Sequence, residues 1–226
     1  MPTFASAGSQ RWLQVAVNRR PQLLLSALRR SGAIGPRVSV TWCSPLEEEN
    51  FQEYRDGKAL EKAGITKLNK PLDKFWPARG PVWDALGITS EEHPLFLEAK
   101  AHIPETATPA TRASPASRDL IEQSLKEARR FYAPRATADW SRLFYQYANR
   151  LAHQYFLRKA NDVLSILVFL YFVNADDMLG PMSEEEWNGA VRLIHAVLGL
   201  PKDLTSYGVF DAFLDTRLLQ DAVDSN

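Results

Sequence analysis

Hydrophobic and polar residues alternate over residues 94–103 of the chain. One face of this segment carries Leu95, Leu97, Ala99 and Ala101, and the other carries Phe96, Glu98, Lys100 and His102. Because successive side chains of a strand point to opposite faces, the pattern predicts a strand with three ionisable groups in a row on one face. Burying such groups is costly unless an ion, a partner or a solvent-filled cleft compensates them.

Other segments predict further elements by the same criterion. Alternation predicts strands over residues 38–42 and 209–215, and the apolar run over residues 162–173 predicts a strand that is covered on both faces. Helical spacing predicts helices over residues 12–28, 44–63, 117–132, 139–158 and from Ser183 onward, the first of them interrupted by Pro21. Two helix starts, Ser44-Pro45-Leu46-Glu47 and Ser183-Glu184-Glu185-Glu186, match a capping box. The acidic run at residues 47–49 is therefore assigned to helix capping and solvation.

The order of these elements predicts an α/β protein with a central mixed sheet flanked by helices, because neighbouring strands and strands separated by helices both occur. A chain of 226 residues suits one domain over residues 1–226. A helical N-terminal part at residues 9–33 and a C-terminal helix with an edge strand at residues 183–215 belong to it.

Charge and composition narrow the function classes. Lys and Arg together equal Asp and Glu at 27 each, which argues against a protein held on nucleic acid or on a membrane mainly by overall charge. A local basic groove is still compatible with this balance. Cys43 is the single cysteine, so no intrachain disulfide forms and a reducing compartment fits. The first ten residues lack a secretory signal, and the apolar run over residues 163–173 is too short to span a bilayer, so we expect a soluble cytoplasmic protein without a membrane partner.

An acidic residue upstream in the sequence suggests a function for the row of ionisable residues on this strand. Asp84 lies in a second short apolar segment, residues 82–86, and Glu98-Ala99-Lys100 lies on the strand that follows. An acid followed by Glu-x-Lys on a neighbouring strand is a metal-site pattern. The residues alone leave a second interpretation open, an ordinary ion pair on a half-exposed strand.

Asp84, followed by Leu95-Phe96-Leu97-Glu98-Ala99-Lys100, resembles the PD-(D/E)XK superfamily, the restriction-endonuclease-like nucleases. The resemblance covers about residues 44–174 and implies a restriction-endonuclease-like core with extra helices at both ends. Trp83 occupies the position of the proline that gives the superfamily its name, and Pro81 lies two residues earlier.

The resemblance also implies a chemistry. Asp84 and Glu98 would hold Mg²⁺ (or Mn²⁺), a hard cation that prefers oxygen ligands, and Lys100 would orient the attacking water. Glu53, on the preceding helix, would complete the metal site; Asp56 or Glu49 are the alternatives. The expected function is a metal-dependent nuclease that hydrolyses phosphodiester bonds, with nucleic acid, most simply DNA, as its partner.

Two further residues belong to a second tier. His102 shares the face of Glu98 and Lys100, and it is either a hydrogen-bonded structural residue or a phosphate contact or proton shuttle. Gln146, together with Asn149, can reach a cleft, because helices after the E-x-K strand pack beside the site in this superfamily.

Two rival functions are compatible with the same residues. The first is a non-catalytic module that keeps the nuclease fold and binds nucleic acid or protein. The second is a hydrolase on another substrate, in which Glu98 forms a general acid/base pair with Glu53 or Asp84. The sequence does not distinguish DNA from RNA as the substrate, and it does not show whether the chain forms a homo-oligomer.

Overall fold

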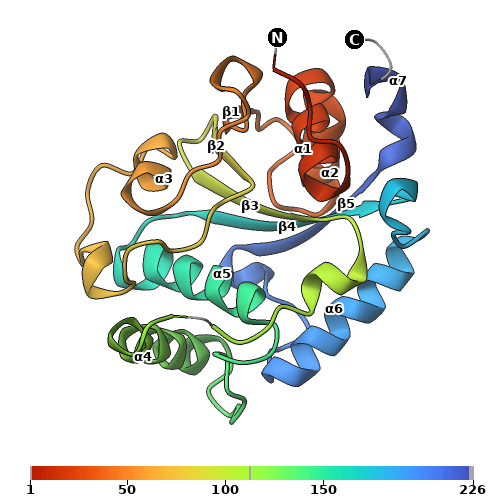
Figure 1. Cartoon of the computed structure of the whole chain (residues 1–226). Coiled ribbons are helices and arrows are strands. Elements are labelled where there is room, and N and C mark those ends of the chain that lie inside the picture. Colours follow the sequence, from red (N-terminus) through yellow and green to blue (C-terminus); the bar gives the residue numbers. More distant parts are fainter. Residues whose placement is uncertain (1, 112, 224–226) are drawn as a thin grey trace.

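Five strands form one sheet whose order in space is their order in the sequence (Figure 1). The computed structural model describes residues 2–111 and 113–223. The strands are β1 (Val40–Ser44), β2 (Ala85–Thr89), β3 (Pro94–Lys100), β4 (Ile166–Val173) and β5 (Val209–Asp215). β1, β2 and β3 pair antiparallel, whereas β4 and β5 run parallel to β3. The protein is therefore an α/β fold with a central mixed sheet, as predicted.

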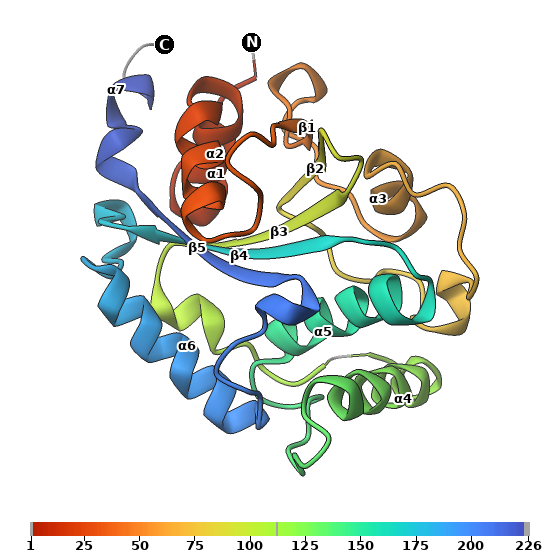
Figure 2. The same ribbon diagram turned by 180° about the vertical axis from the view of Figure 1, so that it is seen from behind.

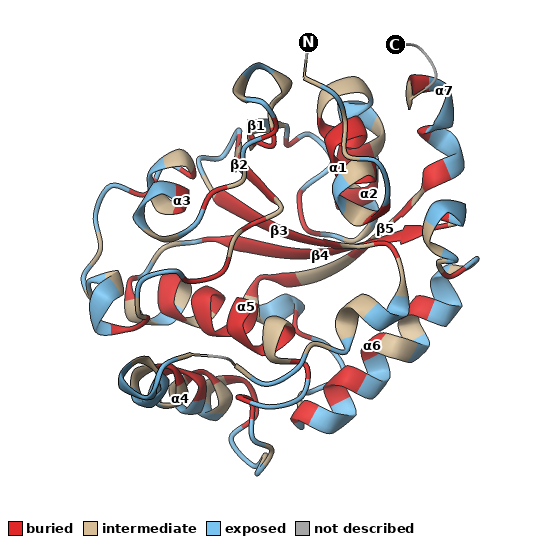
Figure 3. Cartoon of the chain, viewed as in Figure 1, coloured by how far each residue is buried: buried red, intermediate tan, exposed pale blue. Residues whose placement is uncertain are grey.

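The lengths of the segments between the strands explain why some pairs are antiparallel and others parallel. A short turn at residues 90–93 joins β2 to β3, which is enough for antiparallel strands. The two parallel pairs each need a crossover, and helices supply both of them. Every residue of β4 is buried, because this strand has a neighbour on each side and helices over both faces (Figure 3).

Helices cover the two faces of the sheet unequally (Figures 1 and 2). One face is covered by α1 (Gly8–Arg19) and α2 (Pro21–Arg30). The other face and its surroundings hold α3 (Asp56–Lys62), α4 (Pro115–Tyr132), α5 (Tyr145–Tyr155) and α6 (Glu184–Leu198), and the short α7 (Gln220–Val223) follows β5. α5 packs on the sheet through Leu151 and Ala148, and α4 lies outside α5. Each strand thus contributes alternate side chains to one of two cores.

Several predicted helix boundaries are confirmed or close. The break at Pro21 separates α1 from α2, with the proline at the first turn of α2. Ser183 caps α6, accepting a hydrogen bond from the backbone N–H of Glu186 at 3.3 Å. The helix expected from residue 117 begins slightly earlier, at Pro115.

The helix predicted over residues 44–63 is wrong. Residue 44 ends β1, residues 47–49 form only a 3₁₀ turn, and the helix in this region is the short α3. The acidic run does not cap a helix, because Glu47 pairs with Arg19 at 2.5 Å while Glu49 pairs with Lys62 and accepts from the hydroxyl of Tyr54 at 2.6 Å. Partners distant in sequence therefore decide the conformation here.

Two other boundaries need correction. The helix predicted over residues 139–158 begins only at Tyr145 and ends in a π turn, and Leu143, before its start, is 47% exposed. The strand predicted over residues 94–103 ends at Lys100, so His102 lies beyond it. Within the described chain, no helix combines the length and the apolar character needed to cross a membrane.

Candidate functional site

Asp84 and Glu98 come together through the pairing of β2 with β3. Ala85 pairs with Leu97 at the start of this antiparallel ladder, so the same register continued by one residue sets Asp84 opposite Glu98. Directly opposite residues of antiparallel strands are close neighbours. Asp84 is fixed there because its Oδ2 accepts a hydrogen bond from the backbone N–H of Ala99 at 2.8 Å. The two predicted metal ligands thus share one end of the sheet.

Glu53 also lies at this end of the sheet, but it does not come from a helix as predicted. It lies in an extended segment before α3 rather than on a helix. Tyr54 forms an isolated antiparallel bridge with Trp83, whose N–H donates to the carbonyl of Tyr54 at 2.9 Å. The residue before Tyr54 therefore runs alongside the residue after Trp83, which brings Glu53 next to Asp84. Gln10 Nε2 of α1 donates to Glu53 Oε1 at 3.1 Å.

The two alternative acids are engaged elsewhere. The carboxylate of Asp56 accepts from the backbone N–H groups of Arg79 at 2.9 Å and Gly80 at 2.8 Å, so it fixes a loop. Glu49 is held by Lys62 and Tyr54. Of the three acids considered, Glu53 is the one that lies beside the Asp84–Glu98 pair.

The charge of Glu98 is neutralised by two cations. Glu98 is 1% exposed and Arg150 is 2% exposed. Glu98 Oε2 lies 2.6 Å from Nε and 2.5 Å from Nη2 of Arg150, and Glu98 Oε1 accepts from the ammonium group of Lys100. Such a buried carboxylate needs partners of this kind, because an unpaired charge in the interior is strongly destabilising.

Arg150 is the residue of the site that the sequence interpretation missed. It comes from α5, where its Nη1 donates to Asn149 Oδ1 at 2.9 Å and its Nη2 to the carbonyl of Val82 at 2.7 Å. Its guanidinium carbon lies 4.8 Å from the centre of the Trp83 ring. The residue that replaces the superfamily proline thus provides a surface on which Arg150 stacks. One signal pointed to Arg150: it follows Gln146 by four residues, and such pairs share a helix face.

The pKa values of the three acidic residues are shifted in different directions. Burial raises the pKa of Asp84 to about 7, and the negative charge of Glu98 adds to the effect. Burial likewise raises the pKa of Glu53, and Glu98 again contributes. Burial also acts against the ionised form of Glu98, but the attraction of Arg150 and Lys100 outweighs it and lowers the pKa of Glu98. Three carboxyl groups therefore share one electrostatic environment with two cations.

The three carboxyl groups outnumber their two cationic partners. When Glu53, Asp84 and Glu98 are all ionised, they exceed Lys100 and Arg150 by one negative charge, and the excess must be met by a proton or by a metal ion. Mg²⁺ commonly binds through one or two carboxylates and keeps several waters. Among the described residues no group of three His, Cys, Asp or Glu side chains is placed to hold one ion. Asp84 and Glu98, which the ladder sets opposite each other, are the two carboxylates that a metal ion would have as ligands here.

Gln146 lies beside the ionised pair. Together with Glu98, Lys100, Tyr147 and Tyr171 it lines a cavity of about 10 Å³. A cavity of this size has room for about one water molecule. The placement agrees with the expectation that Gln146 reaches the site from α5.

His102 lies next to Glu105, beyond the end of β3. Its Nδ1 lies 3.0 Å from Glu105 Oε1, and Glu105 Oε2 accepts from the backbone N–H of Ala101 at 3.1 Å. Glu105 therefore holds the chain where it leaves β3, whereas His102 Nδ1 is buried and makes no hydrogen bond to any described residue. Both interpretations of His102 stay predictions.

Comparison with known proteins gives no match: no family model, no curated protein and no solved structure is similar to this chain.

Proposed function

We propose that this protein is a metal-dependent nuclease of the PD-(D/E)XK type that hydrolyses phosphodiester bonds in nucleic acid. The observation that carries the proposal is the alignment of Glu53, Asp84 and Glu98 on three adjacent chain segments, with Lys100 two residues farther along β3. Two neighbouring carboxylates beside a lysine supply both metal ligands and a positive charge for the reacting phosphate.

Each residue has a distinct role in this proposal. Asp84 and Glu98 hold Mg²⁺ or Mn²⁺, and Glu53 completes the acidic set. When bound, the ion polarises a phosphodiester oxygen and lowers the pKa of a water ligand. Lys100 orients the attacking water and offsets the charge that develops on the phosphate. Gln146 contacts the same small cavity and positions the groups around it.

Nucleic acid, first of all DNA, is the proposed partner, although the balanced charge of the chain implies that binding depends on local rather than overall charge. A cytoplasmic location, in which Cys43 stays a free thiol, is part of the proposal.

The first experiment compares wild type with Lys100→Ala on supercoiled plasmid, linear DNA, single-stranded DNA and RNA. We expect cleavage with Mg²⁺ or Mn²⁺, none with a chelator, and a loss of about a hundredfold or more in Lys100→Ala, because that variant loses a charge that stabilises the transition state. Lys202→Ala, at an exposed lysine far along the chain, is the matched control and should cleave like wild type.

Asp84→Asn separates loss of chemistry from loss of folding. The folded protein holds the Asp84 proton more tightly than the unfolded chain, since burial raises the pKa of Asp84 to about 7. The free energy of unfolding therefore falls as the pH rises toward 7 and Asp84 ionises, and the loss is complete above that pH. Asp84→Asn should melt no lower than wild type at pH 8 and yet be inactive. Equal activity in wild type and Lys100→Ala would instead indicate a contaminating nuclease and refute the proposal.

One observation favours the non-catalytic alternative. Both oxygens of Glu98 already have cationic partners, as in a purely structural ion-pair cluster. A module of this kind would bind nucleic acid or protein and show no cleavage with either metal ion. Hydrolysis of a substrate other than nucleic acid that persists in the presence of a chelator and in Lys100→Ala would select the other rival, an acid/base hydrolase.

A further inference from the structure

A cavity of about 470 Å³ has Asn149, the chain neighbour of Arg150, among its lining residues, whereas the carboxylate cluster (Glu53, Asp84 and Glu98) lies outside its lining. Its walls come from the loop at residues 76–81, from the segment that leads into α4, and from the first turns of α5, where Tyr145 and Asn149 line it. Ligand sites typically have volumes of about 300–1,000 Å³, so this cavity is large enough for a small organic group.

The polar groups in the walls of this cavity are positive or neutral, and the rest of the lining is apolar. Arg79 is the charged residue among the described lining residues, and no Asp or Glu is found there. Hydroxyl groups come from Thr111, Ser114 and Ser117, and Asn149 adds an amide. Among the described residues, the guanidinium of Arg79 has no hydrogen-bond or ion-pair partner. An anion is the ligand that such walls favour.

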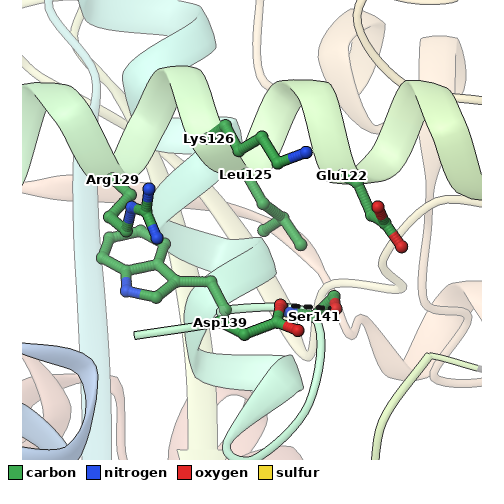
Figure 4. Close-up of a pocket in the computed structure, with 7 residues that line it drawn as sticks. Glu122, Leu125, Lys126, Arg129, Asp139 and Ser141 are labelled. Atoms are coloured by element: carbon green, nitrogen blue, oxygen red, sulfur yellow. Dashed lines mark hydrogen bonds between the residues drawn. The ribbon is translucent and has the colours of Figure 1, made fainter. Parts of the chain in front are cut away.

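The neighbouring cavities along α4 differ in this respect. Figure 4 shows one of about 230 Å³, in which the carboxylates of Glu122 and Asp139 lie among Lys126 and Arg129. Asp139 there accepts from the hydroxyl of Ser141 at 2.6 Å. A second cavity of about 500 Å³ contains Glu122 and Asp139 as well. These mixed charges do not select an anion.

The loop that carries Arg79 is held in place before any ligand binds. The backbone N–H groups of Arg79 and Gly80 both donate to the carboxylate of Asp56, at 2.9 and 2.8 Å. Gly80 has no space for a side chain, since an added Cβ would lie 2.8 Å from Asp56 Oδ1. Holding a binding loop in one conformation reduces the ordering cost of association.

One hydrogen-bond network joins the cavity to Glu98. Asn149 lines the cavity and accepts from Arg150 Nη1 at 2.9 Å. The same guanidinium contacts Glu98 at 2.6 Å and the carbonyl of Val82 at 2.7 Å, and Val82 follows Pro81, which is itself a lining residue. Arg150 is therefore hydrogen-bonded both to a lining residue of the cavity and to Glu98.

We propose that this cavity binds a nucleotide phosphate of the nucleic-acid strand, adjacent to the phosphodiester cleaved at the carboxylate cluster. Arg79 contacts the phosphate, the hydroxyl groups before and within the first turn of α4 accept or donate hydrogen bonds to the nucleotide, and Tyr145 provides a flat surface. This inference rests on the proposed nuclease function and assigns the part of the substrate that lies next to the reacting bond.

The test measures binding without cleavage, with Ca²⁺ in place of Mg²⁺ and a fluorescent oligonucleotide. Arg79 has a positive φ of 68°, so the variant is Arg79→Asn, because asparagine tolerates this conformation better than alanine. We expect affinity to fall about five- to tenfold at 0.1 M salt and the slope of log K against log salt to become shallower by about 0.7–0.9, as for the loss of one phosphate contact. Arg37→Asn, at an exposed arginine in a turn, is the control and should bind like wild type.

The outcomes separate this inference from the function on which it rests. If wild type cleaves nucleic acid while Arg79→Asn keeps its affinity and salt slope, the cavity assignment is wrong and the nuclease proposal stands. If wild type neither binds nor cleaves the oligonucleotide, the nuclease proposal itself fails. A nucleoside 5′-monophosphate tested alone identifies the source of the phosphate: tight binding of it by wild type, without oligonucleotide binding, would overturn the assignment to a strand.

Discussion

Glu98 has two cationic partners that differ in their surroundings. The Arg150 side chain is 3% exposed and bound on several sides, by Val82, Asn149 and the Trp83 ring, whereas the Lys100 side chain is 13% exposed and faces a small cavity. Arg150 is therefore suited to holding Glu98 in position. In the proposed mechanism, Lys100 would leave Glu98 for the substrate phosphate, and Glu98 would not become an unpaired buried charge because Arg150 remains.

This division of roles predicts the effect of removing Arg150. Arg150→Met keeps much of the side-chain volume but leaves Glu98 buried with one partner, which should lower the free energy of unfolding by about 3–5 kcal/mol. Urea denaturation at neutral pH measures the change. The control is Arg217→Met, because Arg217 is 71% exposed and pairs with Asp215 at the surface; it should cost less than about 1 kcal/mol. Similar losses in both variants would show that Arg150 does not anchor Glu98.

The residues of the site were predictable to different degrees. The spacing of Asp84, Glu98 and Lys100 is visible in the sequence because alternation within a strand is a local property. The position of Glu53 depends on the bridge between Tyr54 and Trp83, and the position of Arg150 depends on how α5 packs on the sheet. The bridge leaves no periodic signal, and for Arg150 the four-residue spacing from Gln146 is the one sign in the sequence. Whether these residues bind metal is a prediction that stays open to the experiments above.

At the scale of the element, two similar helix-start signals have different outcomes. Ser183 caps α6, and the long apolar stripe of that helix, with Trp187 and Ile194, is buried against the rest of the protein. Ser44 begins no helix, because the chain around it completes β1 and then places Glu47 against Arg19. A capping box predicts a helix only when the residues after it have a face to bury.

The contribution of a true cap can be measured against a matched serine. Ser183→Ala removes the acceptor for the N–H of Glu186 and should lower the free energy of unfolding by about 1 kcal/mol. Ser114 occupies the same position before α4 but makes no side-chain capping bond, so Ser114→Ala should change stability by only a few tenths of a kcal/mol. Thermal or urea unfolding of both variants tests the difference, and equal effects would contradict the assignment of the cap.

At the scale of the whole molecule, the sheet separates two apolar cores. Leu97, Val168 and Leu214 face α1 and α2, whereas Phe96, Phe169 and Val209 face the helices of the other layer. The order of predicted elements was sufficient for an α/β fold with a mixed sheet. It could not show that the first two helices cover an entire face, because an amphipathic helix does not reveal its partner.

Because of this arrangement, we expect the N-terminal and C-terminal segments to be required for folding. A fragment of residues 44–174, which contains the proposed catalytic residues, lacks α1, α2 and β5. It would expose Leu97 and Val168 on one face and leave the outer edge of β4 unpaired. We expect the fragment to be unfolded or aggregated by circular dichroism and size-exclusion chromatography, whereas the full chain is folded. A monomeric fragment with native-like amide dispersion in an NMR spectrum would refute this expectation.

The contact of α2 with β5 also sets the order of events during synthesis. Each strand emerges from the ribosome next to the neighbour already made, so the sheet can extend in the direction of translation. The face under α1 and α2 is different, since Arg30 of α2 donates to the carbonyl of Phe213 at 2.9 Å and Leu24 packs in the same core as Leu214. α2 therefore completes its packing only after β5 has been made, although α1 can already pack against β3. Until then, part of this apolar face stays exposed on the growing chain, where it can aggregate.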